Sequence, residues 1–369
     1  MSNEADDGGA ITEGPSVAPL PVRGASERLA RATIEDVARR ASVSVATVSR
    51  ALRQLPNVAV ATRQRVQQAA QDLAYRADPH ASRLAMGRTR TIGMAVPLLG
   101  AWYFSQVVAG AEAVLKHEGY DLLLMGVVNS DERRRFVREW VVLQKRVDGL
   151  LLVDLRLDPE ELAELSDVDA ALVTIGDRYR GYSSVTIDNH AAAALAVRHL
   201  LELGHRAVGL IGDSANPELS FSVPGDRRRG YLDAMAGAGI EPRPELEVPG
   251  NFTVIGGYAA MARLLATADP PTAVFAMSDE MAIGATKAAR DHGLSVPDDL
   301  SIIGFDDHDL ADAFGLTTIR QPVADIGGQA ARFLIERLET RASAGPRVPA
   351  VSIEPTTLVV RSSTRQLPG

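Results

Sequence analysis

Cysteine is absent from the 369-residue sequence, and lysine occurs three times against 36 arginines. Without thiols the chain forms no disulfide, no zinc–thiolate site and no cysteine nucleophile. No apolar run reaches the roughly 18 residues that a transmembrane helix needs. The N-terminus lacks the basic and apolar regions of a secretory signal. We therefore expect a cytoplasmic protein that does not enter a membrane.

Charge is distributed unevenly along the chain. Residues 1–28 are acidic and rich in Gly and Pro, and we predict a disordered tail there. Residues 29–90 hold 11 arginines and four acidic residues, a net charge of +7. Residues 91–369 carry −12, which the net charge of −8 for the whole chain conceals. A basic module attached to an acidic body predicts a polyanion-binding head on a carrier that does not itself bind DNA.

The stretch from Thr33 to Leu52 predicts two short helices joined by a tight turn. Apolar residues from Ile34 to Ala41 recur at helical spacing, and Ser42-Val43-Ser44 interrupts them. Ser44 is suited to cap the second helix. The outer face of that helix would carry Val45, Ala46, Thr47, Ser49 and Arg50. This pattern fits a helix that enters a DNA major groove, and an ordinary helical hairpin is the alternative.

A third helix near Ala61 would complete a small helical head over residues 29–78. Pro79 disfavours helical geometry at Asp78 and can itself begin a new helix. Residues 79–90 are thus predicted to form a hinge helix and linker. A helix this short is marginal in water, so we expect it to be ordered only with a partner.

From Thr91 onward, short apolar runs alternate with helical stretches. The predicted strands are 92–96, 121–125, 149–153, 171–175, 207–211, 272–276 and 300–304. The predicted helices are 106–118, 132–146, 190–203, 227–239, 256–266 and 280–292. Such alternation indicates doubly wound parallel sheets, here in two α/β lobes over residues 91–361, with a tail at 362–369. The chain would cross between lobes near Asp188, near 318–321 and near Val348.

Polar residues that follow the strands predict a ligand cleft, because parallel sheets bind ligands beyond the carboxyl ends of their strands. They are Asp177-Arg178, Asp188, Asp213, Ser278-Asp279 and Asp306-Asp307. Phosphate loops, dinucleotide fingerprints, nucleophile elbows and H-E-x-x-H pairs are absent from the sequence, so we expect no enzyme and no cofactor.

Three clusters carry alternatives. His205 is interpreted as a structural residue in preference to a metal ligand. The acids around Asp306 are interpreted as hydrogen-bonding groups, again in preference to metal ligands. Residues 102–104, Trp-Tyr-Phe, are either an aromatic pocket wall or core.

Together these residues resemble the LacI/GalR (lactose-repressor) family of bacterial transcription regulators, from about Ala32 to Arg361. The specific stretch is TIEDVARRASVSVATVSRAL with the following TRQRVQQAAQDLAYRADPHASRLAMGRTRTIGMAVP. Further matches are RVDGLLL, VTIDN, HLLELGHRAVGLIGD, SDEMAIGA, LSIIGFDD and LTTIRQP. The resemblance implies a helix-turn-helix head and a two-lobed body similar to periplasmic sugar-binding proteins.

The resemblance also implies a role for each matching residue. Val45 and Ala46 would read base edges, and Thr47 and Arg50 would add base or phosphate contacts. Phosphate contacts would come from Thr33, Ser44, Thr62, Arg63 and Tyr75. Leu84 would be wedged into the minor groove, with packing between paired hinge helices as the alternative. Effector contacts would come from Trp102, Phe104, Asp177, Arg227, Ser278 and Asp306.

The predicted function is a homodimeric repressor whose affinity for a near-palindromic operator depends on a sugar-like effector. Only eight residues follow Arg361, too few for a tetramer-forming heptad helix. Departures from the family pattern include Ser42 for the usual turn glycine, Ala59 for a capping serine and Ser278 for a frequent asparagine. The rival functions are a solute-binding protein without gene control and an α/β enzyme.

Overall fold

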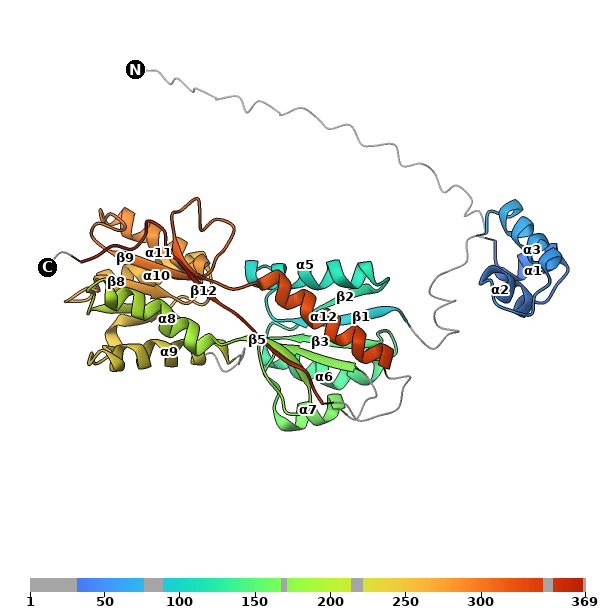
Figure 1. Cartoon of the computed structure of the whole chain (residues 1–369), viewed down its shortest axis with the longest axis horizontal. Helices are drawn as coiled ribbons and strands as arrows, with labels where there is room; N and C mark the ends of the chain where they lie inside the picture. The colour runs from blue at the N-terminus through green and yellow to red at the C-terminus, as the bar shows by residue number, and fades with distance from the viewer. Residues whose placement is uncertain (1–31, 76–88, 167–170, 214–221, 341–347, 368–369) are drawn as a thin grey trace, which may run out of the picture. The chain divides into compact units, whose positions relative to one another are not determined.

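The computed structural model describes residues 32–75, 89–166, 171–213, 222–340 and 348–367 (Figure 1). They fall into two compact units, a helical head and a larger body, which separate after Ala85. The predicted tail at 1–28 and the hinge helix from Pro79 to Met86, including Leu84, lie outside the described residues. No helix in the described part of the chain is long and apolar enough to span a membrane.

The described head consists of three helices, and all three were predicted. They are α1 (Ile34–Ala41), α2 (Val45–Leu52) and α3 (Val60–Asp72). Each buries one apolar stripe in a shared core, in which Val37, Val48 and Val66 are fully buried. Because all three helices are short, their stability derives mainly from this shared core.

The body contains two six-stranded sheets, each within its own lobe. The first lobe has the strand order β11-β5-β4-β3-β1-β2, and the second has β12-β10-β9-β8-β6-β7. Within the described residues, the strand pairings are parallel except that between β10 and β12. The first sheet comprises β1 (Thr91–Val96), β2 (Asp121–Gly126), β3 (Gly149–Val153), β4 (Ala171–Ile175), β5 (Ser183–Ile187) and β11 (Val351–Glu354). The second comprises β6 (Val208–Gly212), β7 (Glu247–Pro249), β8 (Ala273–Ala276), β9 (Ser301–Asp306), β10 (Thr317–Arg320) and β12 (Thr357–Val359).

Helices cover both sheets, as expected for parallel strands that are buried on two faces. The first lobe carries α5 (Trp102–His117), α6 (Ser130–Leu143), α7 (Pro159–Ser166) and α12 (Val323–Thr340). The second carries α8 (Asn189–Glu202), α9 (Val223–Gly237), α10 (Val254–Leu265) and α11 (Asp279–Asp291), with a 3-10 turn at Pro244–Leu246. This arrangement confirms the two-lobed, doubly wound prediction.

The chain crosses between the lobes three times, close to the predicted places. The first crossing is at Asp188 between β5 and α8, and the second is at Gln321-Pro322 between β10 and α12. The third lies between β11 and β12, a few residues later than predicted. After it, Ser363 is buried and its hydroxyl donates to the Ile302 carbonyl at 2.6 Å. Residues 362–367 therefore belong to the second lobe, which corrects the predicted tail.

The α12 helix was not predicted, although it is the longest helix described. It packs against α5, beside which it is drawn in Figure 1. A Cβ added to Gly110 of α5 would lie 1.8 Å from the Ala324 carbonyl oxygen, and one added to Gly327 would lie 2.0 Å from that of Val107. Glycines that lower helix propensity are therefore required here by the close approach of two backbones.

Candidate functional site

The helix-turn-helix geometry of the head is set by hydrogen bonds at helix ends. At the start of α1, Thr33 and Asp36 form a reciprocal capping box. Ser42 ends that helix at φ 52°, in the left-handed region where glycine is usual. The Ser44 hydroxyl then accepts a hydrogen bond from the Thr47 backbone N–H at 3.2 Å, which caps α2 as predicted.

The outer face of α2 is exposed on the surface of the head and can contact another molecule. Val45 is 40% exposed, and Ala46 and Arg50 are also exposed, whereas Val48 and Ala51 lie in the core. An apolar side chain with this exposure gains by packing against another surface. The predicted reading residues thus share one accessible face.

The remaining predicted DNA contacts lie around α3. Thr62 and Arg63 are half-buried in its first turn, and Tyr75 is half-buried after its end. Arg63 also donates to the Leu55 carbonyl at 3.0 Å, so part of its guanidinium already holds the preceding loop. Ala59 supplies no side-chain cap for α3, so the first N–H groups of this helix keep their capacity to bond an external acceptor.

The body contains a cavity of about 60 Å³ between its two lobes. Its walls come from the ends of strands in both sheets, where a ligand site was predicted. Residues from the first lobe are Leu98, Ala101, Tyr103, Phe104, Asp154, Gly176, Thr186, Ile187 and Ile326. Residues from the second lobe and the crossings are Asn189, Val223, Arg227, Phe252, Ser278, Glu280, Asp306 and Gln321.

Arg227 is the cationic group of this cavity, and it is held rigidly. Its Nε donates to the Asn189 side-chain oxygen at 2.9 Å, and its Nη1 donates to the Met277 carbonyl. The guanidinium also stacks on the Phe305 ring, 3.5 Å from the centroid. Burial lowers the pKa of Arg227, and the nearby Asp306 carboxyl opposes this effect. A planar donor fixed in this way is preorganised for oxygen acceptors on a ligand.

Two buried carboxyl groups face the same cavity. Burial raises the pKa of Asp306 to about 7, against the opposing effects of Arg227 and a 2.6 Å hydrogen bond from Gln321. Burial also raises the pKa of Asp154 to about 7, and the Asp177 carboxyl adds to this increase. Perturbed carboxyls that converge on a cavity are typical of binding sites.

Four of the six predicted effector residues line the cavity: Phe104, Arg227, Ser278 and Asp306. Asp177 lies instead in a second cavity. Trp102 lies between the lobes, where its Nε1 donates to Asp309 at 3.0 Å and its ring lies 4.9 Å from that of His308. The cavity therefore brings together four of the six predicted residues, and effector contacts by Trp102 and Asp177 stay predictions.

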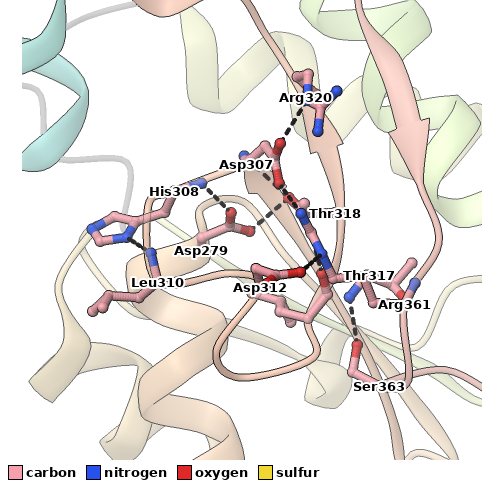
Figure 2. Close-up of polar contacts among 11 residues, drawn as sticks. Asp279, Asp307, His308, Leu310, Asp312, Thr317, Thr318, Arg320, Arg361 and Ser363 are labelled. Atoms are coloured by element: carbon pink, nitrogen blue, oxygen red, sulfur yellow. Dashed lines mark hydrogen bonds and ion pairs between the residues drawn. The ribbon is translucent and has the colours of Figure 1, made fainter.

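Acidic residues at the start of α11 and at the end of β9 form hydrogen bonds, the role interpreted from the sequence for the acids around Asp306 (Figure 2). Asp279 accepts from the Thr318 hydroxyl at 2.7 Å and from the His308 backbone N–H at 2.8 Å. Asp307 accepts from Arg320 at 2.6 Å and from Arg361 at 2.8 Å. The described residues contain no cluster suited to a metal ion. His205 bonds Thr272, Ser301 and the Arg365 carbonyl at 3.0 to 3.2 Å, consistent with a structural role.

Several cavity residues were missed by the sequence reading, chiefly Asp154, Asn189 and Gln321. Tyr103 also lines the cavity, and it belongs to the aromatic run for which a pocket wall was one of the two predicted roles. Asp154 directly follows β3, so the rule that found Asp306 at the end of β9 would also have found it. Asn189 and Gln321 lie at the lobe crossings, which place them at the cleft.

Known proteins resemble this chain over both units. Residues 33–78 match the model of bacterial regulatory proteins of the lacI family, and residues 197–364 match that of the periplasmic binding protein-like domain. The HTH-type transcriptional repressor CytR of Escherichia coli (strain K12) is 36% identical over 343 residues, covering 91% of this chain and 97% of CytR. The chain belongs to the LacI family.

Two solved structures extend this likeness to the fold. A lac repressor dimer bound to operator and the anti-inducer ONPF matches with a TM-score of 0.77 and 26% identity, covering 90% of this chain and 99% of that one. A complex of the transcriptional regulator CelR with cellobiose matches with a TM-score of 0.66 and 30% identity, covering 90% and 100%. As a LacI-family member, the chain is a DNA-binding transcriptional regulator controlled by a small molecule, and it is not an enzyme.

Proposed function

We propose that this LacI-family regulator acts in the cytoplasm as a homodimeric repressor of a near-palindromic operator, under the control of a sugar-like effector held between the lobes. One observation carries the proposal. A head with an exposed recognition face is joined in one chain to a body with a cleft that presents a fixed arginine and buried carboxyls. The proposed domains are the head at 29–78, the hinge at 79–90 and the body from 91.

In the head, Val45 and Ala46 read groove edges, and Thr47 and Arg50 contact bases or phosphates. The exposure of this face supports that assignment. Neither Val nor Ala forms side-chain hydrogen bonds, so the pair distinguishes bases mainly through thymine methyl groups. Thr33, Ser44, Thr62, Arg63 and Tyr75 contact phosphates and set the register. Leu84 acts as the minor-groove wedge.

In the body, Arg227 and Asp306 bond effector hydroxyls, Phe104 packs on the ring, and Ser278 lines the same wall. The cellobiose complex among the similar structures supports a sugar-like ligand. A cavity of about 60 Å³ holds only a few water molecules. A sugar therefore requires the lobes to separate and close again around it. Effector and operator affinities are linked if the two ligands favour different lobe arrangements.

The apolar face of α6 supports dimerisation. Val141 is 56% exposed and Val142 is 66% exposed, and Val128 just before this helix is 45% exposed. Exposed apolar side chains that gather on one part of a surface are typical of protein–protein interfaces. We propose that this face contacts the same face of a second copy.

The test is selection of bound fragments from the source genome, followed by footprinting at moderate salt. We expect a protected near-palindrome and an affinity that falls steeply with salt concentration. The full-length Arg50→Ala variant should bind the operator more weakly than the original protein. Arg290→Ala, at an exposed position in the body, should leave operator affinity unchanged. Failure to protect any site would refute the repressor function.

Truncation assigns the two activities to their units. A chain that lacks residues 1–88 should lose DNA binding and keep effector binding. Loss of both activities, or operator binding that survives the truncation, would contradict the proposed division of roles.

A further inference from the structure

Asp154 occupies an unusual place in the cleft. It directly follows β3, lines the cavity and is 3% exposed. Its backbone has φ 44°, in the left-handed region that favours glycine. Backbone strain of this kind persists where the surrounding structure fixes a residue, and it is frequent at ligand sites.

The carboxyl group of Asp154 is only partly satisfied. It accepts a hydrogen bond from the Tyr103 hydroxyl, but its Oδ1 has no hydrogen-bond partner among the described residues. This oxygen lies against Gly176, where an added Cβ would lie 1.7 Å from it. The glycine therefore leaves room for a carboxyl oxygen that no described residue bonds. Burying such an oxygen unpaired is unfavourable.

Asp279 in the second lobe is a matched comparison. It is also buried, at 0% exposure, yet its Oδ1 and Oδ2 accept hydrogen bonds from Thr318 and from His308. The fold thus satisfies a buried carboxyl behind the cleft and leaves one unsatisfied at the cavity wall. The difference shows that the described residues do not satisfy Asp154 as they satisfy Asp279.

Charge restricts what that partner can be. The cavity is lined by the carboxyl groups of Asp154, Glu280 and Asp306, and by one guanidinium, that of Arg227. Arg227 already donates to Asn189 and to Met277. Once ionised, these carboxyl groups outnumber the cation and repel an anionic ligand, whose own charge would also oppose their ionisation. A hydroxyl or amino donor would instead complete the bonding of Oδ1.

We propose that Asp154 is a specificity-determining residue whose Oδ1 accepts a hydrogen bond from an effector hydroxyl or amino group, and that the excess of carboxyl groups excludes anionic ligands such as sugar phosphates and nucleotides. This inference rests on the proposed function, since it places the effector in the same cleft.

The first test is isothermal titration with matched probes. These are glucose, glucosamine and glucose 6-phosphate, ribose and ribose 5-phosphate, cellobiose, and adenosine and adenosine monophosphate. Only uncharged or amino-bearing probes should bind, and Asp154→Asn should weaken the best of them about tenfold or more, because the amide offers donors where the ligand needs an acceptor. A phosphorylated probe that binds as tightly as its parent, unchanged affinity in the variant, or no binding by any probe would overturn the proposal.

A second test needs no ligand. Burial raises the pKa of Asp154 to about 7, the Asp177 carboxyl adds to this, and Arg227 and Tyr103 oppose it. The folded pKa exceeds the unfolded value of 3.8. The protonated carboxyl group therefore contributes stability that is fully present below pH 3.8 and is lost as the pH rises toward 7. The Tm of Asp154→Asn relative to the original protein should therefore increase between pH 5 and pH 7.5.

The control for this test is Asp307→Asn. Burial acts to raise the pKa of Asp307, but hydrogen bonds from Arg320 and Arg361 outweigh it and hold the pKa below the usual value. Its Tm difference from the original protein should thus be constant over the same range. A constant difference for Asp154→Asn would contradict the proposal. The two proposals can fail separately. If no operator is protected but the Tm difference of Asp154→Asn still increases with pH, the repressor function is refuted and the unpaired carboxyl group is established.

Discussion

Replacing Trp102 by phenylalanine tests how the two lobes are held together. Trp102 begins α5 in the first lobe, and its indole N–H donates to the Asp309 carboxylate of the second lobe at 3.0 Å. Its ring also lies 4.9 Å from that of His308. Phenylalanine keeps a ring at this position and the backbone N–H that bonds Glu280. The substitution therefore removes mainly the indole donor.

The size of the effect follows from that single bond. A hydrogen bond to a charged group contributes about 1.5–3 kcal/mol when buried. Asp309 is exposed, so solvent screening reduces the contribution to roughly 1 kcal/mol. Because about 1.4 kcal/mol corresponds to a factor of ten, the ratio of closed to open lobes should fall roughly fivefold.

The absence of cysteine from the chain makes the measurement direct. Nitroxide labels at Glu164→Cys on α7 and Arg290→Cys on α11, both exposed positions, report the distance between lobes by pulsed electron resonance. Trp102→Phe should shift population toward the longer distance. Trp140→Phe is the matched control, because Trp140 is 1% exposed within the first lobe and packs on Phe136. An unchanged distance distribution for Trp102→Phe, or an equal shift for the control, would refute the bridging role.

Three further changes test other parts of the molecule. Thr318→Val removes the 2.7 Å hydrogen bond to buried Asp279, and calorimetry should show a Tm lower by roughly 5 °C; an unchanged Tm would contradict the importance of that bond. Val142→Asp places a charge on the exposed apolar face of α6, so sedimentation should show a dimer dissociation constant raised about 100-fold. A variant that stays dimeric would show that the dimer interface lies elsewhere. Ala59→Ser supplies the cap that α3 lacks, worth about 1 kcal/mol, and amide exchange in α3 should slow roughly fivefold; faster exchange would show that the serine does not cap.

The head was predictable because its structure is determined locally. Apolar spacing located α1, α2 and α3, and Ser44 had the chemistry of an N-cap. The body was predictable where strands are continuous apolar runs, as in β3 and β4. The edge strands β7 and β12 have three residues each and give no such signal. The glycines of α12 look unfavourable for a helix until its packing on α5 is known.

Part of the cleft was predictable because some of its residues lie at the ends of strands that the sequence pattern locates. Residues at the carboxyl ends of strands, such as Asp306, lie at the predicted edge. Position in sequence does not reveal the direction of a side chain, however. Trp102 and Asp177 follow strand ends, yet one bridges the lobes and the other lines a different cavity. Family likeness identified Arg227, whereas the unsatisfied oxygen of Asp154 became visible only from its contacts.

The two lobes contribute differently to the cleft. In the second lobe, Arg227 and Asp279 are fixed by bonds within the protein. The buried side-chain oxygens that lack a partner among the described residues belong to Asp154, Asp177 and Ser184, all in the first lobe. Since buried polar groups are normally paired, the first lobe is the one that gains most from a ligand. An effector would therefore dock on the preformed second lobe, and the first lobe would close over it, because closure is the step that satisfies the unpaired oxygen at the cavity wall.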